Sequence, residues 1–144
     1  MKNIIQISEA SSLALHGMCL IAANGRRMSI HEIAAATGAS EAHLSKVFQR
    51  LVKEGMVRSI RGPGGGFDLA KPPESITLLD IYSAIEGMPS TDTCLLHSGS
   101  CPFRTCLFGG FIGDLTERFL GYLGDTTLAD ICCKDGTSFV PKPE

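Results

Sequence analysis

The feature that most constrains the fold is a pair of short helical segments joined by a tight turn, within residues 30–54. Ser29 and Glu32 have the spacing of a capping box, in which each side chain bonds the other residue's backbone N–H, so a helix is expected to begin here. Gly38 ends that helix, and Ser40 is expected to cap a second one. A short helix, a turn of small residues and a second amphipathic helix form the helix-turn-helix pattern, whose second helix reads DNA.

The second helix of this pair has one apolar face and one polar face. Its apolar positions recur at helical spacing and are expected to be buried. On the polar face, lysine and arginine can contact phosphates, while serine, glutamine and histidine can contact base edges. A helix that is merely exposed to solvent would look the same, so this face alone does not decide the function. The candidate DNA-binding residues on this helix or at its start are Ser40, His43, Ser45, Lys46, Gln49 and Arg50.

A glycine-rich turn follows the second helix, flanked by two segments that read as strands. The segments cover residues 56–61 and 67–70, and the second alternates apolar and polar residues. A hairpin directly after a recognition-like helix is typical of a winged helix-turn-helix. An arginine at the tip of the wing can enter a narrow minor groove, and glycines allow the backbone to approach phosphates closely. The wing adds Arg58, Arg61, Gly62, Pro63 and Gly64 to the candidate DNA-binding residues.

A further long helix is expected near the C-terminus. Apolar residues recur at helical spacing from Phe108 to Leu123. Several glycines weaken this helix intrinsically, so packing must stabilise it. We interpret it as a helix that pairs with a second copy of the chain, with a core helix of one chain as the alternative. The other expected helices cover residues 9–23, 30–37, 41–54 and 77–86, and a last short helix includes Cys132 and Cys133.

Three cysteines, Cys94, Cys101 and Cys106, lie within thirteen residues on a segment that contains Gly, Ser and Pro. Thiolates on a flexible segment can converge on a metal ion or an iron–sulfur cluster. In a reducing compartment, clustered cysteines favour metal binding or redox sensing over structural disulfides. A zinc site is one alternative, although zinc sites usually pair cysteines about two to four residues apart. A thiol switch without metal is the other.

The remaining cysteines are expected to have other roles. Cys19 lies among apolar residues of the first helix and is interpreted as a core residue. Cys132 and Cys133 are adjacent, so they point in different directions on a helix, and we expect one to be buried and the other exposed.

Charge is distributed unevenly along the chain. Residues 1–71 contain nine Lys/Arg and five Asp/Glu, whereas residues 72–144 contain four Lys/Arg and ten Asp/Glu. A basic first half suits a polyanionic partner such as DNA. We see no secretory signal and no apolar run long enough to span a bilayer, so we expect a cytoplasmic protein with no membrane partner. No nucleophile–base motif, phosphate-binding loop or catalytic carboxylate pair can be placed, so we expect no enzymatic activity.

The order of these parts closely resembles the Rrf2 family of winged helix-turn-helix transcription regulators. The resemblance covers about residues 7–130, and its most distinctive part is the wing sequence of residues 61–67, followed by the helix start at residues 76–80 and the three-cysteine loop. It implies a homodimeric regulator with a long helix near the C-terminus that crosses to the partner subunit. It also implies that the three loop cysteines hold an iron–sulfur cluster whose state changes how the winged helix meets DNA.

The loop cysteines leave one ligand of such a cluster unassigned. Some family members use a histidine in the third position after the last cysteine, where this chain has Gly109. Others use a carboxylate from the first helix of the partner subunit, where this chain has Ser12. Because Glu9 and His16 share a helix face with Ser12, any of these three, or His97, could complete the site. Both 4Fe–4S and 2Fe–2S clusters stay open, with 4Fe–4S favoured.

The sequence therefore predicts a mainly α-helical fold with a small β-hairpin wing: a winged helix-turn-helix plus a long C-terminal dimerisation helix. Residues 1–75 are expected to form the DNA-binding domain, residues 76–135 the cluster loop (90–106) and dimerisation helices, and residues 136–144 a flexible tail. The predicted function is a homodimer that binds an operator in double-stranded DNA under control of an iron–sulfur cluster, which senses redox state, oxygen, nitric oxide or iron–sulfur status. Alternatives are a zinc-bound or thiol-based redox-sensing regulator of the same fold, and an iron–sulfur electron carrier or scaffold without DNA binding.

Overall fold

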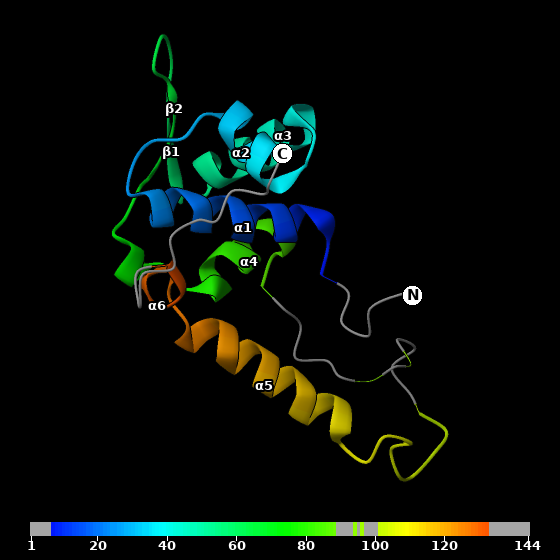
Figure 1. Ribbon diagram of the computed structural model, residues 1–144. Coiled ribbons are helices and arrows are strands. Elements are labelled where there is room, and N and C mark those ends of the chain that lie inside the picture. The colour runs from blue at the N-terminus through cyan, green and yellow to red at the C-terminus, as the bar shows by residue number, and fades with distance from the viewer. Residues whose placement is uncertain (1–6, 89–93, 95, 97–100, 133–144) are drawn as a thin grey trace.

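The computed structural model describes residues 7–88, 94, 96 and 101–132 (Figure 1). The fold is mainly α-helical with one antiparallel hairpin, as the sequence predicts. The tail of residues 136–144 lies outside the described residues. The elements in order are α1 (Glu9–Asn24), α2 (Ile30–Thr37), α3 (Glu41–Lys53), β1 (Val57–Ile60), β2 (Gly66–Leu69), the 3-10 helix η1 (Pro73–Ser75), α4 (Leu78–Glu86), α5 (Phe111–Asp125) and α6 (Leu128–Cys132).

Two of the helices begin at capping boxes. At the start of α2, the backbone N–H of Glu32 donates to Ser29 Oγ at 3.1 Å, and the N–H of Ser29 donates to Glu32 Oε2 at 2.8 Å. At the start of α4, Thr77 and Asp80 exchange the corresponding bonds at 3.0 and 2.9 Å. These bonds satisfy backbone donors that a helix cannot pair internally. The expected starts of both helices are therefore confirmed.

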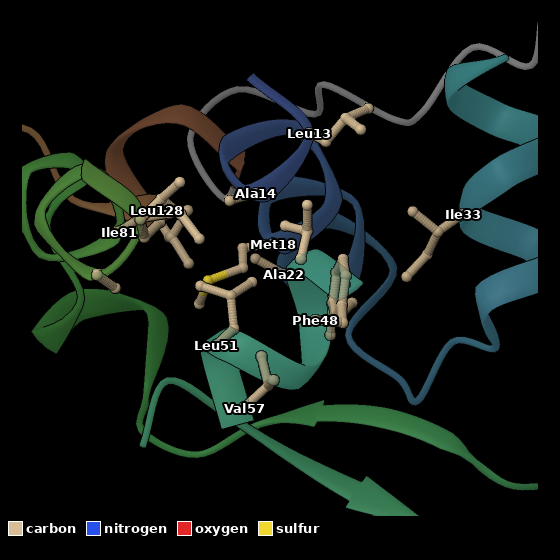
Figure 2. Close-up of a cluster of buried hydrophobic side chains, with 14 of the residues drawn as sticks. Leu13, Ala14, Met18, Ala22, Ile33, Phe48, Leu51, Val57, Ile81 and Leu128 are labelled. Atoms are coloured by element: carbon tan, nitrogen blue, oxygen red, sulfur yellow. The ribbon is translucent and has the colours of Figure 1, made fainter. Parts of the chain in front are cut away.

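Helix α1 runs through the middle of the molecule. Helices α2 and α3 lie on one side of it, and α4 and α6 lie on the other (Figure 1). Figure 2 shows side chains from α1, α2, α3, β1, α4 and α6 gathered in one hydrophobic cluster. Gly17 allows the close approach of α1 to α3, because a Cβ there would lie 2.8 Å from the ring of the fully buried Phe48.

The hairpin is held at its base by the segment before α2. Strands β1 and β2 pair from Val57↔Leu69 to Ile60↔Gly66. Met28 adds a bridge to Phe67, with N–H···O bonds of 3.2 and 2.8 Å in the two directions. Both strands differ slightly from the expected 56–61 and 67–70. Met56 instead closes the end of α3, with its N–H donating to the carbonyl of Leu51 at 2.9 Å.

Helix α5 lies along the outside of the molecule and reaches beyond the other helices at its N-terminal end (Figure 1). It begins at Phe111 rather than at the expected Phe108, because the two preceding glycines adopt left-handed φ values of 56° and 86°. Its C-terminal half packs on α4, where Tyr82 and Phe119 stack edge-to-face with ring centroids 5.8 Å apart. None of the described helices is long and apolar enough to cross a membrane.

Candidate nucleic-acid interface and cysteine loop

The recognition helix α3 divides into a buried and an exposed face. Leu44, Val47, Phe48 and Leu51 are all buried, as the apolar spacing predicts. Lys46, Gln49 and Arg50 are exposed. Lys53 belongs to the polar face expected from the sequence but not to the candidate residues, and Ala42 belongs to neither. Both are exposed, and helical spacing places both on the face of Lys46 and Gln49. That spacing is the signal by which the two residues could have been included.

The first turn of α3 uses some candidate residues for its own structure. The hydroxyl of Ser40 accepts the backbone N–H of His43 at 3.2 Å, so it acts as the N-cap. His43 is partly exposed, and its Nδ1 lies 3.7 Å from Oε1 of Glu9 in α1. Ser45 is also partly exposed. Contacts of these three side chains with DNA stay predictions.

A charged junction joins α3 to the start of α1 and the end of α4. The carboxylate of Glu86, the last residue of α4, accepts hydrogen bonds from the hydroxyls of Ser8 and Ser11. The hydroxyls of Ser11 and then Ser8 hold the pKa of Glu86 below its usual value, and the positive charge of Arg50 adds to this effect. The candidate DNA-binding residues His43 and Arg50 thus face carboxylates of their own chain.

The wing presents its candidate residues to solvent. Arg58, Arg61, Gly62, Pro63 and Gly64 are all exposed. The turn closes through the N–H of Gly65, which donates to the carbonyl of Gly62 at 2.9 Å. The wing projects from the body of the molecule next to α2 and α3 (Figure 1). Contacts of these wing residues with DNA stay a prediction.

The three loop cysteines are exposed thiols. Within the described part of the chain, no three His, Cys, Asp or Glu side chains are grouped so that they could hold a metal ion. Residues 95 and 97–100, which lie between Cys94 and Cys101, are outside that part. The thiols are therefore not brought together here, and their role as ligands stays a prediction.

The surroundings of Cys106 suit a thiolate. The backbone N–H of Phe108, then that of Gly110 and that of Gly109, hold the pKa of the Cys106 thiol below its usual value. Hydrogen bonds from backbone amides stabilise a metal-bound sulfur in the same way as a free thiolate. The donor chemistry at this position therefore fits an iron–sulfur ligand, and it equally fits a reactive cysteine.

The candidate fourth ligands on α1 do share one side of the helix, but they have different neighbours. His16 Nδ1 lies 2.7 Å from the carbonyl oxygen of Ser12 and 3.4 Å from its hydroxyl. Glu9 instead lies near His43. The remaining candidate, His97, is outside the described residues.

Cys19 lies partly buried against the core, where α1 meets α6. Burial raises its pKa to about 12, and Cys132 of α6 adds to this effect. A thiol with so high a pKa is a poor nucleophile and a poor metal ligand at neutral pH, which agrees with its interpretation as a core residue. Cys132 is partly buried, and the expectation for Cys133 falls outside the described residues.

The amino-acid sequence is similar to that of known transcriptional regulators. Residues 7–134 match the sequence pattern of the Rrf2 family, described as an iron-dependent transcriptional regulator. The chain is 30% identical over 129 residues to the HTH-type transcriptional regulator IscR of Klebsiella pneumoniae (strain 342), covering 88% of this chain and 79% of that protein. IscR of Escherichia coli (strain K12 / DH10B) is likewise 30% identical over 129 residues, which are 80% of its length.

Solved structures show the same similarity. CymR (YrzC), the global cysteine regulator of B. subtilis, superposes with a TM-score of 0.72 at 28% identity, covering 92% of this chain and 99% of that one. IscR of T. potens superposes with a TM-score of 0.69 at 26% identity, covering 89% and 86%. Both agreements extend over nearly the whole chain, which includes the hairpin and the helix that follows the cysteine loop.

Proposed function

Because the chain belongs to the Rrf2 family of DNA-binding transcriptional regulators, we propose that it acts as a cytoplasmic homodimer whose operator binding is controlled by its cysteine loop. The relatives are named as transcriptional regulators, and we propose no catalytic activity for this chain. One observation carries the proposal: the thiol of Cys106, whose pKa backbone amides hold below its usual value, lies shortly before α5, the helix that we propose as the dimer contact.

We place the DNA along the exposed face of α3. Lys46 and Arg50 would supply positive charge for phosphates, and the exposed Gln49 would reach a base edge with its amide. Arg61 of the wing would enter an adjacent minor groove. Ser40, His43, Ser45, Arg58 and the turn of Gly62, Pro63 and Gly64 complete the proposed contact surface.

Selection of DNA by the protein tests this arrangement. Duplexes enriched from a random-sequence library should bind with an affinity that falls steeply as salt rises. Replacement of Arg61 with alanine should weaken binding about tenfold, because one charged groove contact is lost. An unchanged affinity of the Arg61→Ala protein would remove the wing from the interface.

We propose that α5 forms the dimer contact. Phe111 and Tyr122 are 60% and 62% exposed, and of the residues in α5 only Leu123 is buried. Helical spacing places Phe111, Leu115 and Tyr122 on one side of α5, away from the side that packs on α4. An apolar strip of this kind on a helix marks an interaction surface, and a second copy of the same helix fits it by symmetry.

We propose that Cys94, Cys101 and Cys106 hold an iron–sulfur cluster. Glu9, Ser12, His16 or His97 would supply the fourth ligand, and 4Fe–4S is favoured over 2Fe–2S. When bound, the cluster would supply reversible redox and ligand-exchange chemistry at this position. The amides of residues 108–110 would stabilise the sulfur of Cys106 whatever the cluster type.

The charged junction offers a route from the loop to the recognition helix. Glu86 ends α4 shortly before the cysteine loop begins, and its carboxylate lies near Arg50 and binds the start of α1. A change in the path of the loop would move the end of α4, and with it the Glu86 carboxylate, whose negative charge attracts Arg50. We propose that this movement alters how α3 presents Arg50 to DNA.

The cluster is tested by purification without oxygen. The protein should be coloured and contain iron and acid-labile sulfide, and Cys101→Ala should lose both. Cys132→Ala is the matched control, because it removes a cysteine outside the loop and should leave the absorbance unchanged. A colourless protein that contains zinc would contradict the cluster and indicate a zinc site instead.

Thiol-based sensing without a metal is the second candidate. The lowered pKa of the exposed Cys106 favours it, because an exposed thiolate reacts readily with oxidants and alkylating agents. Iodoacetamide labelling of metal-free protein, mapped by mass spectrometry, should modify Cys106 much faster than Cys19. A metal-free protein whose DNA affinity changes reversibly with peroxide and dithiothreitol would favour this candidate over the cluster.

A further inference from the structure

The wing has little support of its own. Its strands have four residues each, and an isolated two-stranded hairpin is marginally stable in water. The base is fixed, since Met28 bridges Phe67 and the Phe67 ring lies 4.9 Å from that of Phe48. Residues 61–65 extend beyond the last strand pair, Ile60↔Gly66. This tip carries Arg61. Contacts other than those at the base of the hairpin are needed to orient it.

One side of the wing is not filled by packed side chains. An open hollow of about 690 Å³ lies between the end of α3 and the outer side of β1, with Val52, Gly55 and Val57 among its lining residues. Arg27, which lies in the connection between α1 and α2, also lines this hollow. Contacts made by Arg27 across it can therefore restrain the wing where packing does not.

Arg27 contacts both a strand and the tip of the wing. Its Nε and Nη2 donate to Oδ2 of Asp68 at 3.2 and 3.1 Å, and its Nη1 donates to the carbonyl of Gly64 at 3.4 Å. Both members of the ion pair are partly shielded from solvent, with side-chain exposures of 37% and 25%. A guanidinium has its donors in a fixed plane, so these three bonds define the direction of the tip relative to β2.

Asp68 is bonded to Arg27 although another arginine lies opposite it on the hairpin. In the strand register Arg58 faces Asp68, but the hydrogen bond of Arg58 goes from Nη2 to the carbonyl of Leu69 at 3.4 Å. The carboxylate is therefore bonded to the body of the protein rather than to its cross-strand neighbour.

We propose that Arg27 and Asp68 form a brace that orients the wing for DNA binding, and that Arg27 acts as a positioning residue rather than as a phosphate contact. The inference rests on the proposed role of Arg61. The brace predicts an effect of replacing Asp68 on DNA affinity that is opposite to the effect expected from charge alone. Removing the charge of Asp68 makes the DNA-binding half more positive, which favours DNA, whereas loss of the brace disfavours it.

The substitution Asp68→Asn separates the two effects. Binding to a fluorescent duplex selected by the wild-type protein should weaken about threefold to tenfold, as is usual for loss of a coupled side-chain pair. Glu54→Gln is the matched control: it removes an exposed carboxylate at the end of α3, and its affinity should be unchanged or higher. Arg27→Lys keeps the charge but loses the planar fork, and it should weaken binding as Asp68→Asn does. All variants should retain the wild-type far-ultraviolet circular dichroism.

The Arg61→Ala background shows whether the brace acts through the wing. There, Asp68→Asn should cause no further weakening, because the contact that the brace positions is already absent. The brace is overturned if Asp68→Asn or Arg27→Lys binds as tightly as wild type while Arg61→Ala binds weakly. If Arg61→Ala itself binds as wild type, the proposed role of the wing fails, and the brace fails with it.

Discussion

Helices α1 and α5 of this chain are similar in length but differ in how they are packed. In α1, seven residues are buried, among them Ala14 and Met18, which are fully buried. In α5, Leu123 alone is buried, while Phe111 and Tyr122 expose most of their surface. The apolar face of α1 is thus buried by its own chain. In α5 an apolar face stays in contact with water, which is unfavourable.

This difference supports the proposal that a second subunit packs against α5. The recognition helix and the wing are supported by residues of their own chain, through Gly17, Met28 and Arg27. Among the described elements, α5 has such support chiefly from α4. Substitutions in the two regions should therefore differ in kind: those around α1 should change the stability of each subunit, and those on α5 should change association.

The largest effect is expected from Tyr122→Glu. A charge within the proposed dimer contact should give monomers in sedimentation equilibrium. Operator affinity should fall by about 10²- to 10⁴-fold, because two half-sites would no longer be bound by one linked dimer. Glu117→Lys, at an exposed position toward the other side of α5, is the control and should leave the dimer intact. A Tyr122→Glu protein that remains dimeric would place the contact elsewhere.

Gly66→Ala should have the next largest effect. A Cβ at this position would lie 2.4 Å from the carbonyl oxygen of Met28, and φ is 150°. We expect a loss of about 3 kcal/mol in the free energy of unfolding, since neither backbone can move without breaking the bridge at the base of the wing. Gly64→Ala has a left-handed φ of 71° but no atom within 4 Å, so urea unfolding should show a smaller loss of about 1 kcal/mol. Equal losses would mean that the contact with Met28 is unimportant.

Replacing glycine with alanine should change the free energy of unfolding in opposite directions in α1 and in α5. Gly17→Ala should destabilise the protein by about 1–2 kcal/mol, because the Cβ meets the buried Phe48 ring and the gain in helix propensity is smaller. Gly121→Ala has no atom within 4 Å of its Cβ and should stabilise α5 by about 0.5–1 kcal/mol. Thermal unfolding of both proteins at several concentrations measures this. Loss of the dimer in Gly121→Ala would instead show that the partner packs against this glycine.

The smallest effect is expected from Glu32→Gln, which tests a purely local contact. Hydrogen bonds from Arg26 and then from the backbone N–H of Ser29 hold the pKa of Glu32 below its usual value. A lowered folded-state pKa stabilises the protein above the unfolded-state pKa, and the effect is lost as pH falls through the folded-state pKa. We expect a difference of about 0.5 kcal/mol at neutral pH, small because the pair is exposed, that vanishes in acid. A difference that persists at low pH would have another cause.

Local sequence was sufficient for most element boundaries. The capping residues Ser29, Ser40 and Thr77 lie within three positions of the N–H groups that they accept, so the signal is contained in a short stretch. The wing was predictable for the same reason, since its turn and both strands are adjacent in sequence. The start of α5 was predicted less well. There, apolar spacing suggested Phe108, but left-handed glycines delay the helix to Phe111.

The sequence by itself determined the order of the elements, the winged helix-turn-helix and the candidate residues of its DNA-reading face. Only the tertiary structure decided which other residues hold this face and the wing in place. Glu86 meets Ser8 and Ser11 across more than seventy positions, and Arg27 meets Asp68 across forty-one. Such contacts depend on how helices and strands pack, because residues far apart in sequence carry no local pattern that marks them as neighbours. Packing also decided that α1 is enclosed by its own chain, while Phe111 and Tyr122 of α5 are left exposed.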